Sequence, residues 1–117
     1  MSEAKQTPPR QYDLWWAQLP QPAGRRPVLL LSRDGAYAYL NKFVAVEITT
    51  TVRNIAEEVR LGKEEGLPHR CVANFDNIRT VARSALTQRI GRLGVRRRVE
   101  AKRALGHALA WDELTAI

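Results

Sequence analysis

Residues 25–34 of this chain read RRPVLLLSRD. Four aliphatic residues follow Pro27 directly, and a polar Ser-Arg-Asp closes the run. A short apolar run bounded in this way predicts a buried strand. Because arginine is seldom buried without a partner, Arg25 and Arg26 at the start of a core strand mark a position that needs a special explanation.

Strand patterns recur on both sides of this run. Residues 43–48 alternate apolar and mixed positions, which is typical of a half-buried strand, and three threonines, residues 49–51, continue it. Residues 36–42 are ambiguous and fit a short helical turn. The remaining predicted strands are residues 12–19, 58–61, 71–75 and 78–81.

One convincing helix is expected near the end of the chain, from Val95 to about Trp111. Val95, Val99, Leu105 and Leu109 recur at helical spacing and predict the packed face. Many short strands followed by one terminal helix indicate a mainly β, α+β protein. The expected architecture is a small barrel with a helix packed on it.

Length and composition limit the class of protein. The chain has 117 residues, enough for one modest core. Residues 1–11 are polar and proline-bearing and predict a loosely ordered tail, which leaves 12–117 as a single domain. No apolar stretch approaches the roughly 20 residues of a membrane helix. The lone Cys71 excludes an internal disulfide, fits the cytoplasm, and is expected in the core.

The net charge of +7 is unevenly placed. Residues 79–103 hold nine Lys or Arg against Glu100 alone, whereas residues 1–78 are nearly balanced and residues 104–117 are acidic. So basic a segment suggests a polyanionic partner, most simply nucleic acid. The alternative is a solvated, arginine-rich helix face.

Several kinds of catalytic site are absent from the sequence. There is no glycine-rich phosphate loop, no Cys-x-x-Cys and no His-Glu-x-x-His. His69 and His107 lie far apart and outside any polar constellation, so an acid–base pair for RNA cleavage is disfavoured. The carboxylates are too scattered to assemble a two-metal nuclease. We therefore expect no metal and no cofactor.

Polar side chains gather instead at the ends of the predicted strands. Hydroxyl and guanidinium groups together suit a phosphodiester, because they orient it and neutralise its charge. For each arginine, the alternative is an ion pair with a nearby carboxylate. The candidates are Arg25, Arg26, Ser32, Asp34, Thr49, Thr50, Thr51, Arg53, Asp76, Asn77, Arg79 and Thr80.

Five short motifs in order resemble the MazF/PemK-like toxin family. They are Asp13-Leu-Trp-Trp, Arg26-Pro-Val-Leu-Leu-Leu-Ser, Glu47-Ile-Thr-Thr-Thr, Asn77-Ile-Arg-Thr and Leu86-Thr-x-x-Ile-Gly-Arg-Leu93. The resemblance spans about residues 12–111. It implies an SH3-like barrel of the MazF/PemK/CcdB type, a homodimer, and a metal-independent endoribonuclease. Such an enzyme cuts single-stranded RNA at short preferred sequences, leaving a 2′,3′-cyclic phosphate and a 5′-hydroxyl.

The resemblance assigns roles to individual residues. The family's catalytic arginine falls on Arg26 and its catalytic threonine on Thr49. A guanidinium stays protonated at ordinary pH, so residue chemistry favours charge stabilisation by Arg26, while the resemblance leaves proton transfer open. The loop at residues 20–25 is short for the family, and its extra Arg25 offers a phosphate contact. The expected RNA-binding residues are Arg25, Ser32, Thr50, Arg53, Asn77, Arg79 and Thr80.

Partners follow from the same resemblance. We expect single-stranded RNA, with messenger RNA as the first candidate, and an acidic, partly disordered antitoxin that covers the RNA groove and binds DNA as a complex with the toxin. Trp16, Phe75 and Arg79 are available to stack on bases. One alternative is a non-catalytic toxin that binds DNA gyrase, although Trp111 is expected to pack the helix rather than to serve such binding. The other alternative is a basic RNA-binding barrel.

Overall fold

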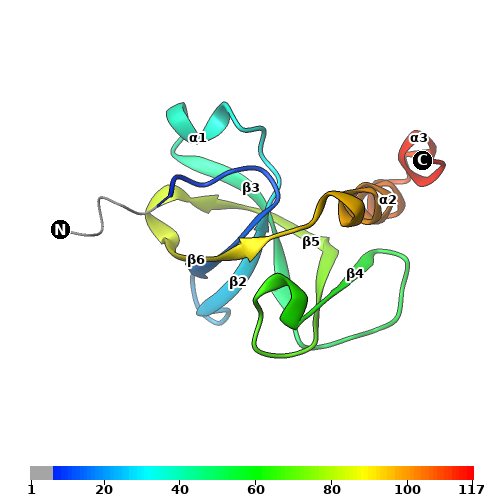
Figure 1. Ribbon diagram of the computed structural model, residues 1–117, viewed down its shortest axis with the longest axis horizontal. Helices are drawn as coiled ribbons and strands as arrows, with labels where there is room; N and C mark the ends of the chain where they lie inside the picture. The colour runs from blue at the N-terminus through cyan, green and yellow to red at the C-terminus, as the bar shows by residue number, and fades with distance from the viewer. Residues whose placement is uncertain (1–6) are drawn as a thin grey trace.

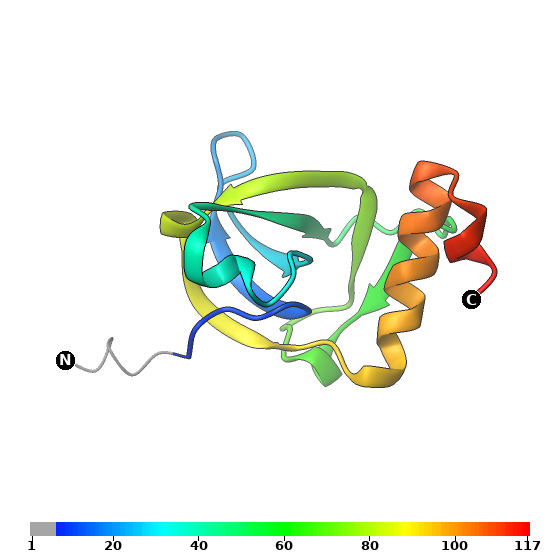
Figure 2. The same ribbon diagram turned by 90° about the horizontal axis from the view of Figure 1, so that it is seen from above.

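The computed structural model describes residues 7–117, which form one six-stranded antiparallel sheet curled into a barrel, with helices at the C-terminus (Figures 1 and 2). The sheet order is β4-β5-β3-β2-β1-β6. The predicted mainly β barrel with a C-terminal helix is therefore confirmed. The elements are β1 (Asp13–Gln18), β2 (Arg25–Leu30), α1 (Ala36–Tyr39), β3 (Lys42–Thr49), β4 (Glu58–Leu61), β5 (Cys71–Ala82), β6 (Leu86–Arg92), α2 (Arg98–Leu109) and α3 (Asp112–Thr115).

The curled sheet buries apolar residues on both of its faces. In β2, Leu29 joins a cluster that includes Ala101 and Ala104 of α2, whereas Val28 and Leu30 join a second cluster with Tyr37 of α1. Successive side chains of a strand point to opposite faces, so an unbroken aliphatic run serves both clusters. This explains why the run in β2 carries no polar residue. Figure 2 shows α2 at one end of the barrel and α1 toward the other.

Strand β2 begins at Arg25, earlier than its apolar run. Trp16 of β1 faces Pro27, but β3 pairs with β2 only from Val28 onward. A residue without an N–H is tolerated where a strand has lost one neighbour. The two arginines are therefore part of the sheet and lie where β2 projects beyond β3.

Residues 71–82 form one long strand, so the prediction of two separate strands is wrong. Ala73 of β5 pairs with Ile48 of β3 and Ile78 pairs with Val46, so the register shifts between these two pairs. Within this shift, the Asp76 amide donates to Asn74 Oδ1 at 2.9 Å. The polar residues that resemble a turn are thus an irregularity at which the strand bends. The bend lets β5 pair with both β3 and β4.

Residues 86–92, to which the sequence assigns no element, form β6 and pair with β1. Gly91 lies where a side chain could not fit, since an added Cβ would stand 2.3 Å from the Glu65 carbonyl oxygen. This close approach brings the short 3-10 turn at Lys63–Glu65 against β6.

The terminal helix is confirmed, and of its predicted packed face Leu105 does pack against the core, but Val95 and Leu109 do not. Val95 is 75% exposed and Leu109 43%, whereas Ala101, Ala104 and Gly106 are buried. A Cβ on Gly106 would lie 2.8 Å from the Cβ of Leu114 in α3. The helix therefore uses its smallest residues for close contact, which hydrophobic periodicity does not reveal.

The end of α2 also differs from the expectation. Ala110, with φ 57°, adopts the left-handed conformation that ends the helix, and α3 begins at Asp112. Trp111 consequently lies between the two helices and is 52% exposed, so the prediction that it packs the helix is wrong.

The sequence also predicts a loosely ordered N-terminal tail and no membrane-spanning helix. Of the tail expected at 1–11, residues 1–6 lie outside the described residues, while the Gln11 amide donates to Asp34 Oδ1 at 2.7 Å. Within residues 7–117, no helix combines the length and the apolar character that crossing a bilayer requires.

Candidate functional site

Three charged side chains from three adjacent strands meet on one face of the sheet. Glu47 of β3 lies opposite Val28, and Arg79 of β5 lies opposite Ala45. Cross-strand partners share a face, as do residues two apart, so Arg26, Glu47 and Arg79 project from the same side. Arg79 Nη1 lies 2.7 Å from Glu47 Oε2, and Arg26 Nε lies 4.0 Å from Glu47 Oε1.

This cluster holds more donors than acceptors. Among residues 7–117 the Arg26 guanidinium donates no hydrogen bond within the usual distance, and the buried Arg79 Nε has no partner. Two arginines share one carboxylate, which leaves a net positive charge. Because Arg presents a fork of donors suited to phosphate, the unused donors can bind a phosphodiester.

Thr49 is the last residue of β3, two positions beyond Glu47 and on the same face. Its Oγ1 accepts a hydrogen bond from the Thr51 amide at 3.1 Å. A threonine hydroxyl has one donor hydrogen as well as its acceptor lone pairs. The accepted bond orients the oxygen and leaves the hydrogen free to donate to a phosphate oxygen.

Arg25, Thr50 and Thr80 are the direct sequence neighbours of Arg26, Thr49 and Arg79. The Arg25 guanidinium carbon stands 4.1 Å from the centroid of the Trp16 ring. Thr50 lines a pocket together with Thr49, and Thr80 lines a larger groove, of about 560 Å³, beside Arg79. These three residues could contact the parts of a nucleic acid on either side of the central phosphate.

Three expected RNA-binding residues lie apart from the cluster or serve the fold. Ser32 follows the opposite end of β2 from Arg26, where its Oγ accepts from the Val44 amide at 2.8 Å. The Arg53 amide donates to the Glu58 carboxylate in the loop after β3. Asn77 is exposed at the bend of β5.

The pocket beside Thr49 brings together residues that the sequence keeps apart. It has a volume of about 110 Å³, and we call it the Thr49 pocket. Its lining is Trp16, Pro27, Ile48, Thr49, Thr50, Leu67, Pro68, His69 and Cys71. The expected core position of Cys71 is confirmed, because it is buried and its Sγ lies 3.9 Å from the Leu61 carbonyl oxygen. Burial, aided by the Glu65 charge, raises the pKa of this thiol.

Sequence reasoning missed Glu47 and His69 as members of the site. Glu47 carries a detectable signal, because it follows Phe43 and Ala45 on the face of an alternating strand that is otherwise apolar. His69 carries none, since a histidine in a polar loop is ordinary. Phe75, considered as a stacking platform, is buried and unavailable. Within residues 7–117, no three His, Cys, Asp or Glu side chains are grouped as metal ligands.

Comparisons with known proteins agree with this geometry. Residues 10–109 match the family model of the PemK-like, MazF-like toxin of type II toxin-antitoxin systems. The chain is 41% identical over 97 residues to the probable endoribonuclease MazF2 of Mycobacterium tuberculosis, covering 82% of this chain and 93% of that protein.

Solved structures show the same similarity. The M. tuberculosis toxin MazF-mt6 superposes with a TM-score of 0.79 at 33% identity, covering 84% of this chain and 96% of that one. A mycobacterial endoribonuclease in complex with its cognate antitoxin gives a TM-score of 0.76 at 26% identity, covering 88% of this chain and 96% of that one.

Proposed function

The chain belongs to the PemK-like, MazF-like toxins of type II toxin-antitoxin systems, and from this membership we propose that it cuts single-stranded RNA with Arg26 and Thr49. The protein is an endoribonuclease toxin, as its relatives are named. The observation that carries the assignment of the site is the guanidinium pair of Arg26 and Arg79, which shares one carboxylate and keeps unused donors.

The proposed reaction uses the RNA's own nucleophile. The ribose 2′-hydroxyl loses its proton and attacks the adjacent phosphorus, and the bond from phosphorus to the 5′-oxygen of the next nucleotide breaks. That oxygen takes up a proton, so the products carry a 2′,3′-cyclic phosphate and a 5′-hydroxyl. No water is consumed, and the step needs charge stabilisation on the phosphate together with two proton transfers.

Arg26 would supply most of that stabilisation. The negative charge on the non-bridging oxygens grows as the 2′-oxygen approaches, and a preorganised guanidinium binds this state better than the ground state. Thr49 would donate its free hydroxyl hydrogen to one of these oxygens. Strands hold both residues, and such rigid elements place side chains more accurately than loops do.

Arg26 is a poor candidate for the proton acceptor, because its guanidinium remains protonated in proteins. The Glu47 carboxylate of the same cluster, only 18% exposed, lies beside both arginines. In the proposed mechanism Glu47 keeps the two guanidinium groups apart and oriented until the phosphate binds. We assign Arg26 to charge stabilisation.

The proposed partners follow the family's biology. An antitoxin with acidic side chains would compete with RNA phosphates for Arg26 and Arg79, and a related endoribonuclease has been solved with its cognate antitoxin. We further propose a homodimer that acts on messenger RNA in the cytoplasm. The shared surface predicts that RNA and antitoxin exclude each other.

Incubation of the protein with labelled single-stranded RNA in excess EDTA tests the proposed reaction. We expect cleavage to persist and the new 5′ ends to accept phosphate from polynucleotide kinase without prior dephosphorylation. A loss of cleavage that magnesium restores would contradict the metal-independent mechanism. Products that kinase cannot label directly would contradict the 2′-hydroxyl attack.

A further inference from the structure

We propose that Glu47 is the general base of the reaction and takes the proton of the ribose 2′-hydroxyl on its Oε1 atom. This inference rests on the proposed function, because it needs a phosphate bound at Arg26. It supplies the proton acceptor that Arg26, which stays protonated, does not provide. When RNA binds, Glu47 changes from the ion-pair partner of two arginines to a group in contact with the attacking oxygen.

The two oxygens of the Glu47 carboxylate have different surroundings. Oε2 accepts a hydrogen bond from Arg79 Nη1 at 2.7 Å, which holds the carboxylate against β5. Oε1 accepts no hydrogen bond from residues 7–117, and it is not one of the fully enclosed polar atoms that lack a partner in this part of the chain. One oxygen therefore anchors the group, and the other is free to accept a proton.

The distance between Glu47 Oε1 and Arg26 leaves room for one bridging oxygen atom. Arg26 Nε stands 4.0 Å from Oε1, which is too far for a direct hydrogen bond. An oxygen can lie about 2.8 Å from each of these two atoms, which is an ordinary hydrogen-bond distance to both. A 2′-oxygen in this position accepts from Arg26 and donates to Glu47. The other N–H groups of the guanidinium remain available to the adjacent phosphate.

The position of Glu47 in the sheet is unusual for a carboxylate. On the same face of β3, Phe43 and Ala45 are fully buried. A charge placed on such a face costs stability unless it is paired and hydrogen-bonded. Glu65, the buried carboxylate elsewhere in the fold, uses both oxygens, one for a backbone amide and the other for Arg97. Glu47 uses only Oε2 in this way, so the fold alone does not account for its free oxygen.

Glu47 is better placed for this proton than the other carboxylates that the structure describes. Among residues 7–117, it is the one carboxylate within 4.0 Å of the guanidinium of Arg26 or Arg79. Asp76 is the neighbouring acidic residue on β5, in the irregular segment between the partners of Val46 and Ile48. It is exposed and forms no ion pair with either arginine. Asp76 is therefore the alternative that the test must exclude.

Protons and electron pairs balance in the proposed step. The 2′-oxygen gives its proton to Glu47 Oε1 and uses its electron pair to bond to phosphorus. The pair of the breaking bond goes to the 5′-oxygen, which takes a proton from water, and Glu47 afterwards returns its own proton to the solvent. The bound phosphate assists the transfer, because a negative charge beside a carboxylate disfavours the ionised form.

Single-turnover cleavage of a short RNA with one cleavage site tests the assignment. Glu47→Gln keeps the size of the side chain but removes the proton acceptor, so the rate at pH 7 should fall about 10³-fold. Glu47→Asp keeps a carboxylate on a shorter side chain and should recover part of this loss. Glu64→Gln is the matched control, because Glu64 is exposed on the 3-10 turn at Lys63–Glu65, and it should keep the wild-type rate.

The pH dependence of the rate separates a base from a structural partner. Arg26 and Arg79, which face Glu47 from β2 and β5, stay protonated throughout. The wild-type rate should fall at low pH, where the carboxylate gains a proton, and level off once it is ionised. The Glu47→Gln rate should instead keep rising about tenfold per pH unit, because hydroxide then removes the proton. If Asp76→Asn rather than Glu47→Gln abolishes the plateau, the base is Asp76 and the assignment is wrong.

Binding of an RNA with a 2′-deoxy nucleotide at the attacking position, which cannot react, completes the test. Glu47→Gln should bind this RNA at least as tightly as the wild type, because it removes a negative charge beside Arg26 and Arg79. Binding weakened by the same factor as the rate would make Glu47 a positioning residue and contradict its role as a base. If the wild type cuts RNA and Glu47→Gln cuts it equally fast, this inference alone fails. If the wild type cuts no RNA, the proposed function fails with it.

Discussion

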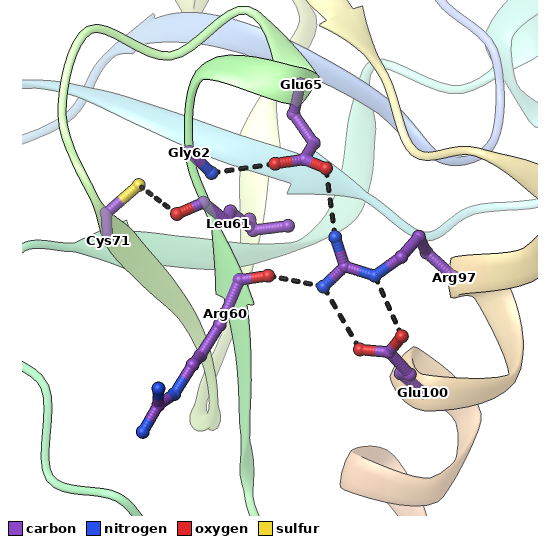
Figure 3. Close-up of polar contacts among 7 residues, drawn as sticks. All are labelled: Arg60, Leu61, Gly62, Glu65, Cys71, Arg97 and Glu100. Carbon is purple, nitrogen blue, oxygen red and sulfur yellow. Dashed lines mark hydrogen bonds and ion pairs between the residues drawn. The ribbon is translucent and has the colours of Figure 1, made fainter.

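Two clusters of arginine and glutamate in this molecule have opposite stoichiometry. At the candidate site, Arg26 and Arg79 share the carboxylate of Glu47. At the base of α2, Arg97 lies between the two carboxylates of Glu65 and Glu100 (Figure 3). The first cluster has an excess of donors, and the second has an excess of acceptors.

The cluster around Arg97 is closed by its own hydrogen bonds. Arg97 Nη1 donates to Glu65 at 2.9 Å, Nε and Nη2 donate to Glu100 at 2.8 and 3.0 Å, and Nη2 also donates to the Arg60 carbonyl. The Gly62 amide donates to the other Glu65 oxygen at 2.7 Å. Hydrogen bonding to Glu100 raises the pKa of Arg97, which keeps the guanidinium charged.

The comparison shows that an arginine's role depends on how its donors are used. All the hydrogen bonds that Arg97 donates go to groups of the protein, and they connect the start of α2 to the β4–β5 connection. Arg26 keeps its donors for a ligand. Both residues belong to Arg-rich stretches, and only the geometry distinguishes the structural arginine from the functional one.

The largest expected effect is on Arg26. Arg26→Ala should lower the rate of RNA cleavage by about 10³-fold, because removing a preorganised charge-stabilising group has effects of this order. The melting temperature should stay near that of the wild type, since Arg26 makes only a 4.0 Å ion pair. Cleavage within a few-fold of wild type by a folded variant would move the active site elsewhere.

The opposite pattern is expected for Arg97. Arg97→Ala leaves Glu65, which is 6% exposed, without its charged partner, and should lower the free energy of unfolding by about 3 kcal/mol. Cleavage per folded molecule should change little. Urea unfolding and an RNA assay at low temperature measure the two quantities. A selective loss of cleavage without loss of stability would remove the distinction between the clusters.

Thr49→Val tests the hydroxyl next to the cluster of Arg26, Glu47 and Arg79. The substitution is nearly isosteric and should reduce the cleavage rate by about 10²-fold, because one donor to the developing charge is lost. Thr51→Val is the matched control. If substitutions of Thr50 or Thr51 have the large effect instead, the catalytic threonine is misassigned by one or two residues.

The smallest expected effect is the pH dependence of stability that comes from Cys71, which lies near Glu65 of the Arg97 cluster. Burial raises the pKa of its thiol, so the folded chain keeps this proton at a pH where the unfolded chain has lost it. The thiol's contribution to stability is therefore complete below the ordinary thiol pKa and declines as pH rises above it, by at most about 1.4 kcal/mol per pH unit. Comparing urea unfolding of wild type and Cys71→Ala between pH 7 and pH 10 isolates this slope, which vanishes if the thiol is unperturbed.

The strands of the barrel could be predicted because their signals are local. The aliphatic run before Ser32 and the alternation through residues 43–48 each lie within a single element. The order of five short motifs further identified the family, and with it the barrel and the toxin's activity. The roles of Arg26 and Thr49 stay predictions that the variants above test.

The sequence by itself determined the strands whose apolar pattern is local, among them β2 and β3, because side-chain periodicity is a property of consecutive residues, but it did not reveal β6 or the continuity of β5. Tertiary structure alone decided which polar groups meet. Glu47 and Arg79 are 32 residues apart, as are Glu65 and Arg97, and only strand register and the curl of the sheet bring each pair together. It also decided how closely α2 packs, because the small residues Ala101 and Ala104 are buried beside Leu105 while Leu109 stays exposed.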